Sequence, residues 1–377
     1  MTPPLGLYLH IPFCLRRCDF CAFYLELYRN VAADEFVNAL KQEIRLHASA
    51  DGVAGRAFHT VYFGGGTPTV FKAGLLVEIL RDLRQTIPLT RDCEITMEAH
   101  PGTVTHSYLS DLFDAGITRI SFGAESMEDD DLARIGRPGA VRQTIAAVQA
   151  ARETGFSNIN LDLMYGLPRQ SVEGWKQTLS RCVELGPEHL SCYALTVEEG
   201  TRLSRDIRDL RAEAPDESLQ IAMDQTAQEL LAEAGYQQYE ISNYAKPGYA
   251  CRHNLLYWTD GDYLGLGPSA QSFVEGVRFG KTANLTAYQS ALAHGQLPIE
   301  ESKPLTEEER LRDAVIFGLR LVQGVPTRQL REHAANFGHR KTLADLKGKR
   351  LIEEDGERSR LSAQGRLHAD TIAEQLY

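Results

Sequence analysis

The sequence predicts an α/β protein: a partial (β/α)6 TIM-like barrel, followed by a C-terminal, mostly helical, winged-helix-like domain. Three observations lead to this fold class. Six short apolar segments alternate with amphipathic helical segments up to residue 194, which is typical of parallel strands joined by right-handed crossovers. A closed barrel needs eight such units, so six indicate an open one. Glycine-rich or polar motifs follow the strands, at the end where barrels carry their sites.

The barrel elements are expected in chain order. The strands are residues 5–11, 60–63, 94–99, 119–122, 158–164 and 189–194. Apolar periodicity predicts helices at 32–48, 73–85, 107–115, 140–154, 172–185 and 216–234. We therefore expect one parallel sheet with its sites at the carboxyl ends of the strands.

The remaining chain divides into two further units. Residues 236–300 are rich in tyrosine and read as an irregular extension packed on the barrel, which itself covers residues 1–235. Residues 301–377 form the winged-helix-like domain, with helices at 307–321, 326–333 and 342–347 and a hairpin at 351–361. The hairpin carries the acidic stretch Glu353-Glu-Asp-Gly-Glu357, a poor partner for phosphates, so this domain is expected to pack or to bind a partner protein.

Composition excludes several function classes. The 377 residues carry a net charge of −11, which argues against nucleic acid as the main partner. Seven cysteines, three of them clustered, do not resemble a disulfide framework. The N-terminus lacks a basic segment followed by an apolar one, and no apolar run approaches the roughly 20 residues that cross a bilayer. These features predict a protein of the reducing cytoplasm.

Three cysteines follow the first strand in the spacing C-x-x-x-C-x-x-C. They are Cys14, Cys18 and Cys21. Pro12 ends the strand, so the cysteines are expected on a loop. A four-iron cluster takes four cysteines, and the next one is Cys93, so three thiolates would leave one iron open to a small ligand. Two alternatives remain: a zinc site with His10 as fourth ligand, and reduced structural thiols.

Glycines and carboxylates lie at the ends of several other predicted strands. The run Gly64-Gly-Gly-Thr-Pro68 suits close backbone approach to a ligand, whose carboxylate or carbonyl its free N–H groups could meet. Glu98, Glu125 and Asp162 lie at successive strand ends. Alone, each would be read as a solvated or capping carboxylate, but together they predict a polar site at one mouth of the barrel.

Taken together, the chain resembles the radical S-adenosyl-L-methionine (SAM) superfamily and, from Leu7 to about residue 370, its HemN/HemW group. The carrying segments are Tyr8-Leu-His-Ile-Pro-Phe-Cys14, Phe20-Cys-Ala-Phe23, Phe63-Gly-Gly-Gly-Thr-Pro-Thr69, Leu161-Asp-Leu-Met-Tyr-Gly-Leu-Pro168, Tyr239-Glu-Ile-Ser-Asn-Tyr244, His253-Asn254 with Tyr257-Trp258, and Gly265-Leu-Gly-Pro-Ser-Ala270. The resemblance implies a 4Fe-4S cluster on the three clustered cysteines, with SAM chelating the open iron through its amino and carboxylate groups.

The resemblance also implies a set of SAM-site positions. These are Tyr8, Phe20, Gly65, Gly66, Thr67, Glu98, Arg137, Asp162, Ala194 and, more loosely, Gln271. Glu125 stands where the family usually has glutamine, which exchanges a neutral amide for a carboxylate, and Thr67 stands where many relatives have an acidic residue. Tyr8 and Phe20 flank the cysteine loop, either as core residues or as contacts to the cluster or the adenine.

Three functions occur in the group. Heme-binding chaperones hand heme to acceptor proteins, often near the membrane. Oxygen-independent coproporphyrinogen III oxidases carry a further cysteine and a longer N-terminus, and HemN-like methylases and cyclopropanases bind two SAM molecules. Here position 23 is Phe23, only 13 residues precede Cys14, and His253 begins a His-Asn-x-x-Tyr-Trp element. These features favour the chaperone, and oxidase activity on coproporphyrinogen III is not expected.

The chaperone interpretation implies partners. They are heme or a porphyrin, a heme-acceptor protein, an electron donor such as flavodoxin or ferredoxin, and a membrane surface for peripheral association, with no nucleic acid. His253 is a candidate axial ligand to the heme iron, with Tyr257 and Trp258 offering flat apolar surface to the macrocycle. The alternative is a structural histidine that holds its segment by hydrogen bonds.

Overall fold

In the computed structural model, which describes residues 4–137 and 139–377, a twelve-stranded sheet runs through the chain. At its centre lie six strands in chain order, each parallel to the next. They are β1 (Leu5–Ile11), β4 (Phe58–Gly65), β5 (Leu89–Ala99), β6 (Arg119–Glu125), β7 (Ile159–Tyr165) and β8 (His189–Ala194). The six expected strands and the open parallel barrel are confirmed.

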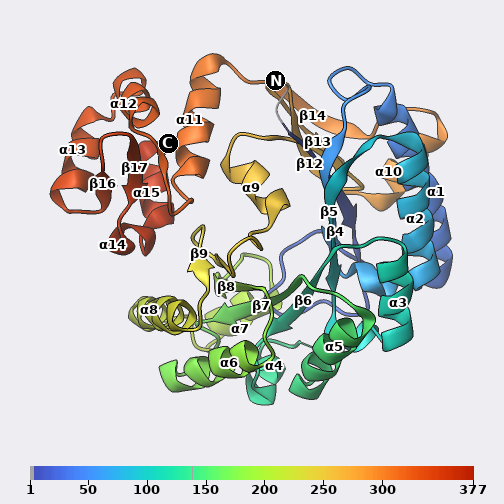
Figure 1. Ribbon diagram of the computed structural model, residues 1–377, viewed down its shortest axis with the longest axis horizontal. Coiled ribbons are helices and arrows are strands. Elements are labelled where there is room, and N and C mark those ends of the chain that lie inside the picture. Colours follow the sequence, from blue (N-terminus) through green and yellow to red (C-terminus); the bar gives the residue numbers. More distant parts are fainter. Residues whose placement is uncertain (1–3, 138) are drawn as a thin grey trace.

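Helices cover the outer side of this curved sheet (Figure 1). They are α1 (Asn30–Ala48), α2 (Ala73–Thr86), α3 (His106–Asp114), α5 (Val141–Thr154), α6 (Val172–Glu184) and α8 (Glu217–Glu233). In α6, the Ser171 hydroxyl caps the first turn by accepting the N–H of Gly174, and Trp175, Leu179 and Cys182 are fully buried at helical spacing. Two short helices, α4 (Asp129–Arg134) and α7 (Arg202–Arg208), were not predicted.

Alternation along the strands separates two environments. On β7, Leu161 and Leu163 belong to the apolar core beneath the helices, whereas Asn160 and Asp162 point to the opposite face and share a hydrogen-bond network with Ser121 of β6. The inner face of the barrel is therefore strongly polar, and the apolar core lies between the sheet and its outer helices.

The expectation that residues 236–300 are irregular was wrong. They form β9 (Gln237–Gln238), β10 (Asn243–Ala245), α9 (Arg252–Trp258), β11 (Asp262–Leu266), β12 (Gln271–Val274), β13 (Val277–Lys281), α10 (Leu285–Ala293) and β14 (Ile299–Pro304). β11 lies parallel to β1, and β12 to β14 continue the sheet as antiparallel strands. Strands this short are stabilised by pairing with distant strands, which local sequence patterns do not reveal.

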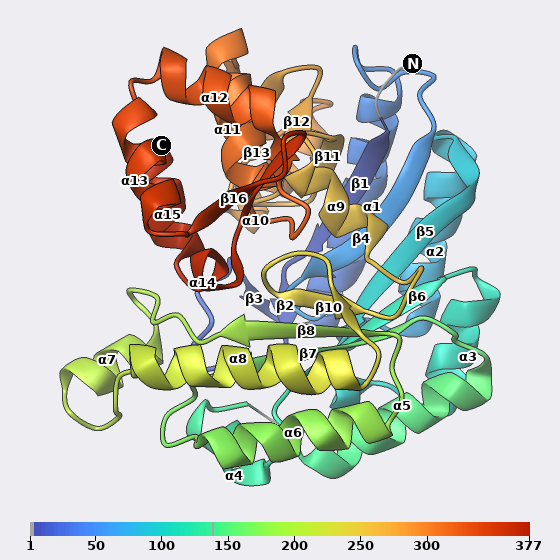
Figure 2. The ribbon, with the colours of Figure 1, turned by 60° about the vertical axis from the view of Figure 1, so that its left-hand side comes forward.

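The C-terminal residues build a small unit with its own apolar core, visible in red in Figure 2. Its helices are α11 (Glu307–Gly318), α12 (Thr327–Asn336), α13 (Arg340–Gly348), α14 (Ala363–Arg366) and α15 (Ala369–Leu376), and its sheet has the order β15 (Val325–Pro326), β17 (Arg358–Leu361), β16 (Ile352–Glu354). The three expected helices and the hairpin are present. The division of the chain into three domains at residues 235 and 300 stays a prediction.

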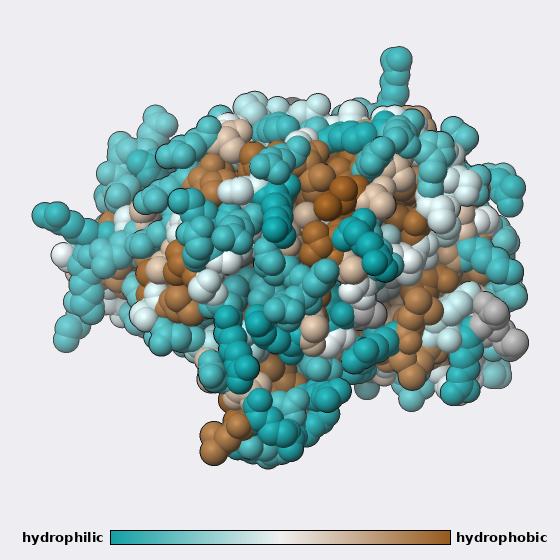
Figure 3. Space-filling model, turned by 90° about the horizontal axis from the view of Figure 1, so that it is seen from below, coloured by the Kyte–Doolittle hydropathy of each residue, from teal (hydrophilic) through white to brown (hydrophobic). Residues whose placement is uncertain are grey.

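Two surface properties complete the description. Within residues 4–137 and 139–377, no helix combines the length and apolar character needed to cross a membrane. Figure 3 shows the molecule from below, where hydrophilic side chains cover most of the face and separate apolar areas lie among them.

Candidate functional site

A cavity of about 870 Å³ opens at the carboxyl ends of the barrel strands. Most of the residues that the sequence singled out line it together. They are Cys14, Cys18, Phe20, Cys21, Gly65, Gly66, Thr67, Glu98, Glu125, Arg137, Asp162 and Ala194. Tyr8, His253 and Gln271 lie outside its lining, as far as the described residues define it. The expected convergence at one mouth is confirmed for the first group.

The cysteine loop is closed by two short parallel strands, β2 (Phe13–Cys14) and β3 (Glu26–Leu27). Cys14 therefore lies on a strand, and only the other two cysteines lie on the loop as expected. The Arg17 guanidinium donates to the carbonyl oxygens of Cys21 (3.2 Å) and Phe23 (3.3 Å), which holds the loop from within. In the part of the chain that the structure describes, all seven cysteines are free thiols.

Two of the three cysteine sulfurs, those of Cys14 and Cys18, have a hydrogen-bond partner. Cys14 Sγ lies 3.4 Å from Thr67 Oγ1, and an Arg137 N–H donates to Cys18 Sγ at 3.6 Å. Burial raises the pKa of both thiols, and Arg137 opposes that effect at Cys18. Three thiols in a partly buried cavity wall with nearby donors fit a cluster in which each thiolate binds a different iron atom.

The single-ion alternative does not match the geometry. Among the described residues, no group of three or more His, Cys, Asp or Glu side chains could hold one metal ion. His10, the suggested fourth zinc ligand, is engaged at both ring nitrogens: Nδ1 lies 3.1 Å from the Tyr8 hydroxyl, and Nε2 lies 3.2 Å from the carbonyl oxygen of Tyr24. A zinc site that uses His10 is therefore not formed here.

The glycine run begins within β4, which ends at Gly65, and its N–H groups bond within the protein. The N–H of Gly66 donates to Ile11 O, and that of Thr67 donates to Phe13 O. The N–H of Gly65 meets Glu98 Oε2 at 3.3 Å. The expectation that these N–H groups are free for a ligand was wrong. A Cβ on Gly65, whose φ is +112°, would lie 2.8 Å from the His10 ring, so the glycine permits that close contact.

Glu98 forms part of the cavity floor. Its carboxylate accepts a hydrogen bond from the Tyr62 hydroxyl at 2.9 Å in addition to the Gly65 N–H. Burial, reinforced by the nearby charge of Asp162, raises the pKa of Glu98 to about 7. The group therefore changes its charge close to neutral pH.

Glu125 has a specific partner. It is the residue where β6 bulges against β7, and its φ of +63° lies in the left-handed region. The Arg137 guanidinium lies 3.3 Å from Glu125 Oε1 and also donates to Gly123 O at 2.7 Å. Burial raises the pKa of Glu125 and Arg137 lowers it. The Glu125 carboxylate therefore has a counter-ion inside the cavity wall.

The Asp162 carboxylate is oriented by hydrogen bonds from side chains of β6 and β7. Its two carboxylate oxygens accept hydrogen bonds from the Ser121 hydroxyl (2.8 Å) and the Asn160 amide (2.9 Å). Asn160 in turn meets His189 Nδ1 at 2.6 Å, and His189 Nε2 lies 2.8 Å from the Tyr239 hydroxyl. This chain of contacts fixes the orientation of Asp162 from the inner face of the barrel.

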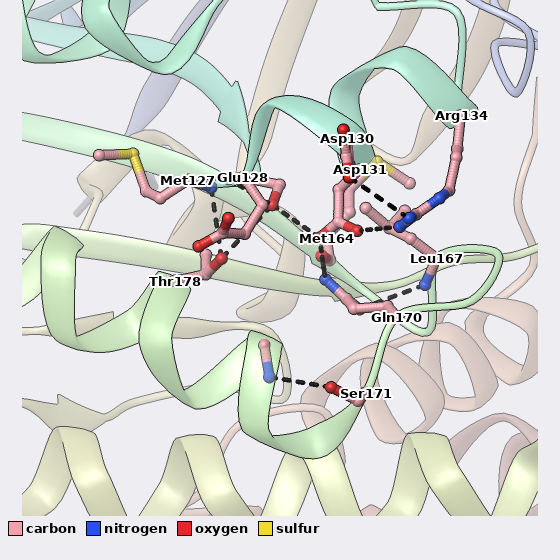
Figure 4. Close-up of polar contacts among 12 residues, drawn as sticks. Met127, Glu128, Asp130, Asp131, Arg134, Met164, Leu167, Gln170, Ser171 and Thr178 are labelled. Carbon is pink, nitrogen blue, oxygen red and sulfur yellow. Dashed lines mark hydrogen bonds and ion pairs between the residues drawn. The ribbon is translucent and has the colours of Figure 1, made fainter.

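A second polar network joins α4 to the segment that follows β7 (Figure 4). Asp131 pairs with Arg134 at 2.9 Å and accepts a hydrogen bond from the Gln170 amide at 3.2 Å. Gln170 also reaches the carbonyl oxygen of Met164, a residue that lines the cavity. The segment after β6 and the segment after β7 are thereby joined, which positions both walls that carry the carboxylates.

His253 is fully engaged within the protein. It is 1% exposed, with Nδ1 2.7 Å from Thr60 Oγ1 and Nε2 2.9 Å from the Tyr257 hydroxyl. Its backbone N–H donates to Glu94 at 3.1 Å, which places the start of α9 on a buried carboxylate. Burial and the charge of Arg119 lower the pKa of His253 to about 3. This geometry matches the structural alternative and leaves no ring nitrogen open to an iron.

The other two predicted residues also lie apart from the cavity. Tyr8 packs with its ring centroid 6.2 Å from that of Tyr62 and reaches the site only through neighbours. Gln271 is exposed at the start of β12.

Sequence reasoning missed several lining residues. They are Leu15, Arg16, Tyr62, His100, Ser121, Met164 and Tyr193, among others. A signal was present for part of them, because Tyr62 and Ser121 stand two residues before Gly64 and Gly123 on their strands and so face the same side. The loop residues Leu15 and Arg16 follow no such periodicity.

Comparisons with known proteins identify the family. Residues 8–182 match the radical SAM superfamily and residues 305–368 match the HemN C-terminal domain. The heme chaperone HemW of Mycobacterium tuberculosis is 34% identical over 376 residues, which is 99% of this chain and 95% of that protein. The heme chaperone HemW of Escherichia coli is 40% identical over 273 residues, 72% of this chain and 71% of that protein.

A solved structure shares the fold. Coproporphyrinogen III oxidase (HemN) from Escherichia coli, described as a radical SAM enzyme, superimposes with a TM-score of 0.86 at 28% identity, covering 100% of this chain and 90% of that one. The radical SAM and HemN C-terminal matches occupy the barrel and the C-terminal unit described above. With relatives above 30% identity along nearly its whole length, the chain belongs to the HemW family of the radical SAM superfamily.

Proposed function

We propose that the protein is a heme-binding chaperone that carries a 4Fe-4S cluster and SAM and transfers heme to an acceptor protein. The observation that carries this proposal is the 34% identity to a curated heme chaperone over 99% of the chain. Exposed Phe23 at the position of a further cysteine in the oxidases supports it, because no fourth thiol is offered there.

Cys14, Cys18 and Cys21 are proposed to hold the cluster. The contacts of Thr67 and Arg137 with two of the sulfurs support the assignment, because hydrogen bonds to ligand sulfurs tune iron–sulfur centres. When bound, a reduced cluster supplies an electron to the SAM sulfonium. The chain's own residues hold the sulfurs, orient them and limit water, since Cys14 and Cys18 are each only 9% exposed.

The buried polar residues that line the cavity are proposed to bind SAM. The Glu98 carboxylate suits an ammonium group, and Asp162, oriented by Ser121 and Asn160, suits hydroxyl or ammonium donors. The Glu125–Arg137 pair offers a cation to a carboxylate. Phe20, Gly65, Gly66, Thr67 and Ala194 line the same space. Tyr8 acts through its contact with His10, and a role for Gln271 stays a prediction.

Iron analysis tests the cluster. Anaerobic reconstitution of the wild type should give about four irons per chain with matching sulfide, and Cys14→Ala, Cys18→Ala and Cys21→Ala should each lose the cluster. Cys93→Ala is the matched control, because Cys93 is equally buried but lies on β5 outside the cavity. Zinc in place of iron, or loss of iron in the control alone, would reject the assignment.

A second candidate function is the oxidase, favoured by the structural similarity to the Escherichia coli enzyme. Reconstituted protein is incubated with SAM, reductant and either coproporphyrinogen III or heme. We expect heme binding without conversion of coproporphyrinogen. A decarboxylated tetrapyrrole would establish the oxidase, and a methylated small acceptor would establish the methylase or cyclopropanase branch.

The remaining partners are part of the same proposal. An electron donor such as flavodoxin or ferredoxin, a heme-acceptor protein and peripheral association with a membrane follow from the chaperone function. The free thiols of the cysteine loop suit the reducing cytoplasm. Pull-down from lysate with the cluster-loaded protein as bait, analysed with and without heme, checks which acceptor binds.

A further inference from the structure

Both ring nitrogens of His253 have partners within the protein, so heme is expected to bind at another surface. An iron porphyrin needs accessible apolar surface for its macrocycle and a cation for its propionates. His253 is 1% exposed and contributes neither. A heme surface is therefore expected where large apolar side chains are exposed near a cation.

The rim of the cavity carries such side chains. Leu15 is 64% exposed and Phe23 is 70% exposed, and both line the cavity from the cysteine loop. Tyr193, which is 38% exposed near the end of β8, lines the cavity from a different element. Because Cys14 and Cys18 are each only 9% exposed, these exposures divide the lining into a buried polar floor and an open apolar rim.

The rim charges are asymmetric. Arg16 is exposed and lines the cavity beside Leu15, whereas the exposed Glu198 lines it near Tyr193. Arg17 is committed to the carbonyl oxygens of the loop. A dianionic ligand is therefore attracted by Arg16 and repelled by Glu198.

We propose that this rim is the heme-binding surface, with Leu15 and Phe23 against the porphyrin macrocycle and Arg16 pairing with a propionate. The proposal rests on the proposed chaperone function and assigns its ligand to a definite place. Apolar surface at the mouth of a polar pocket suits a flat ligand whose edge alone is charged. The phenyl ring at position 23 takes the place of a thiol and gives the loop an aromatic contact.

The test is an anaerobic heme titration of the cluster-loaded protein, followed as difference absorbance in the Soret region. The variants are Phe23→Ser, Leu15→Ser and Arg16→Glu. Leu210→Ser and Arg328→Glu are the matched controls, since Leu210 is 92% exposed and Arg328 is exposed, and both lie outside the cavity. Iron content is measured for every variant, so that loss of the cluster is distinguished from loss of heme.

We expect Phe23→Ser and Arg16→Glu to weaken heme binding at least about tenfold, corresponding to the loss of one aromatic or charge-assisted contact. Iron content should not change, and the controls should match the wild type. Unchanged affinity in all three rim variants, with a wild type that binds heme, overturns the rim proposal and leaves the chaperone function standing. A wild type that binds no heme overturns the chaperone function itself.

Two further outcomes also decide the question. If His253→Ala lowers heme affinity while the rim variants do not, the ligand binds at α9 and the rim is excluded. If Arg16→Glu slows reduction of the cluster by flavodoxin and none of the three rim variants changes heme affinity, the rim receives an acidic redox protein instead, and the heme proposal is again rejected.

Discussion

At the residue scale, His10 links three parts of the site. Its Nδ1 meets the Tyr8 hydroxyl and its Nε2 meets the carbonyl oxygen of Tyr24, where the cysteine loop returns. Its ring also lies directly beneath Gly65. Burial lowers the pKa of His10 to about 4, so the ring is neutral at neutral pH, and a proton on Nε2 allows it to donate to Tyr24.

His10→Ala is therefore expected to loosen the cysteine loop. Loss of the Tyr24 contact should cost about 0.5–1.5 kcal/mol and should lower the amount of cluster retained during gel filtration. His10→Gln keeps a donor of similar reach and should retain more of the cluster. The measurements are thermal unfolding of the apo protein and iron content after reconstitution. Equal behaviour of the alanine and glutamine variants would show that the hydrogen bond has no positioning role.

Glu98 is expected to make stability pH-dependent. Its pKa is raised in the folded protein, from 4.5 to about 7, so its stabilising contribution is fully present below about pH 4.5 and is lost as the pH rises through about 7. Glu98→Gln removes this titration. The Tm of the variant relative to the wild type, measured on apo protein at about pH 5.5 and about pH 8.5, should therefore increase with pH. A constant difference in Tm would mean that Glu98 does not titrate in this range.

At the scale of elements, a buried ion pair joins α1 to the late strands. Lys281 Nζ of β13 lies 2.6 Å from Glu43 Oε1 of α1, and both side chains are 0% exposed. The second Glu43 oxygen accepts hydrogen bonds from the Tyr288 hydroxyl at 2.6 Å and the Gly267 N–H at 2.8 Å. Gly267 packs closely against the backbone of His10, so this pair supports the strand that leads into the cysteine loop.

Lys281→Met should destabilise the protein by about 3–5 kcal/mol, because it leaves the Glu43 carboxylate buried without its counter-ion. Lys303→Met is the matched control: Lys303 is 64% exposed in its pair with Glu309, and because water screens that pair, its loss should change stability far less than the loss of the buried pair. Denaturant unfolding measures both. If the double variant Glu43→Leu/Lys281→Met recovers stability, the unpaired Glu43 carboxylate caused the destabilisation. If it does not, lost packing around Lys281 caused it.

At the scale of the whole molecule, the C-terminal unit combines winged-helix-like elements with an unsuitable surface for phosphates. Arg360 of its hairpin lies 3.1 Å from Asp355 and 3.5 Å from Glu353. Lys347 and Arg331 pair with Glu354. These three basic side chains are therefore paired with carboxylates within the unit, in a chain whose net charge is −11.

The protein is accordingly expected to bind duplex DNA negligibly at physiological salt. Fluorescence anisotropy with a labelled duplex at about 150 mM and about 50 mM salt checks this. Binding that strengthens steeply at low salt would indicate phosphate contacts and would contradict the expectation. A DNA-binding domain of known activity serves as the positive control.

Local sequence patterns were enough to predict the barrel and the residues at its mouth. Strand and helix periodicities are local, and parallel strands bring their carboxyl ends to one edge, so Glu98 and Asp162 were predictable as neighbours across 64 positions of sequence. The spacing of the cysteines indicated a metal centre, because ligands that are close in sequence are also close in space. Their assignment to a cluster and to SAM stays a prediction.

Features that depend on contacts between distant segments became visible only in the folded protein. β11 pairs with β1 although most of the chain lies between them. The Glu125–Arg137 pair explains how a carboxylate is accommodated in the buried cavity wall. The N–H groups of the glycine run and both nitrogens of His253 already have partners within the protein. A motif indicates which groups are present, but packing and register determine which of them remain accessible to a ligand.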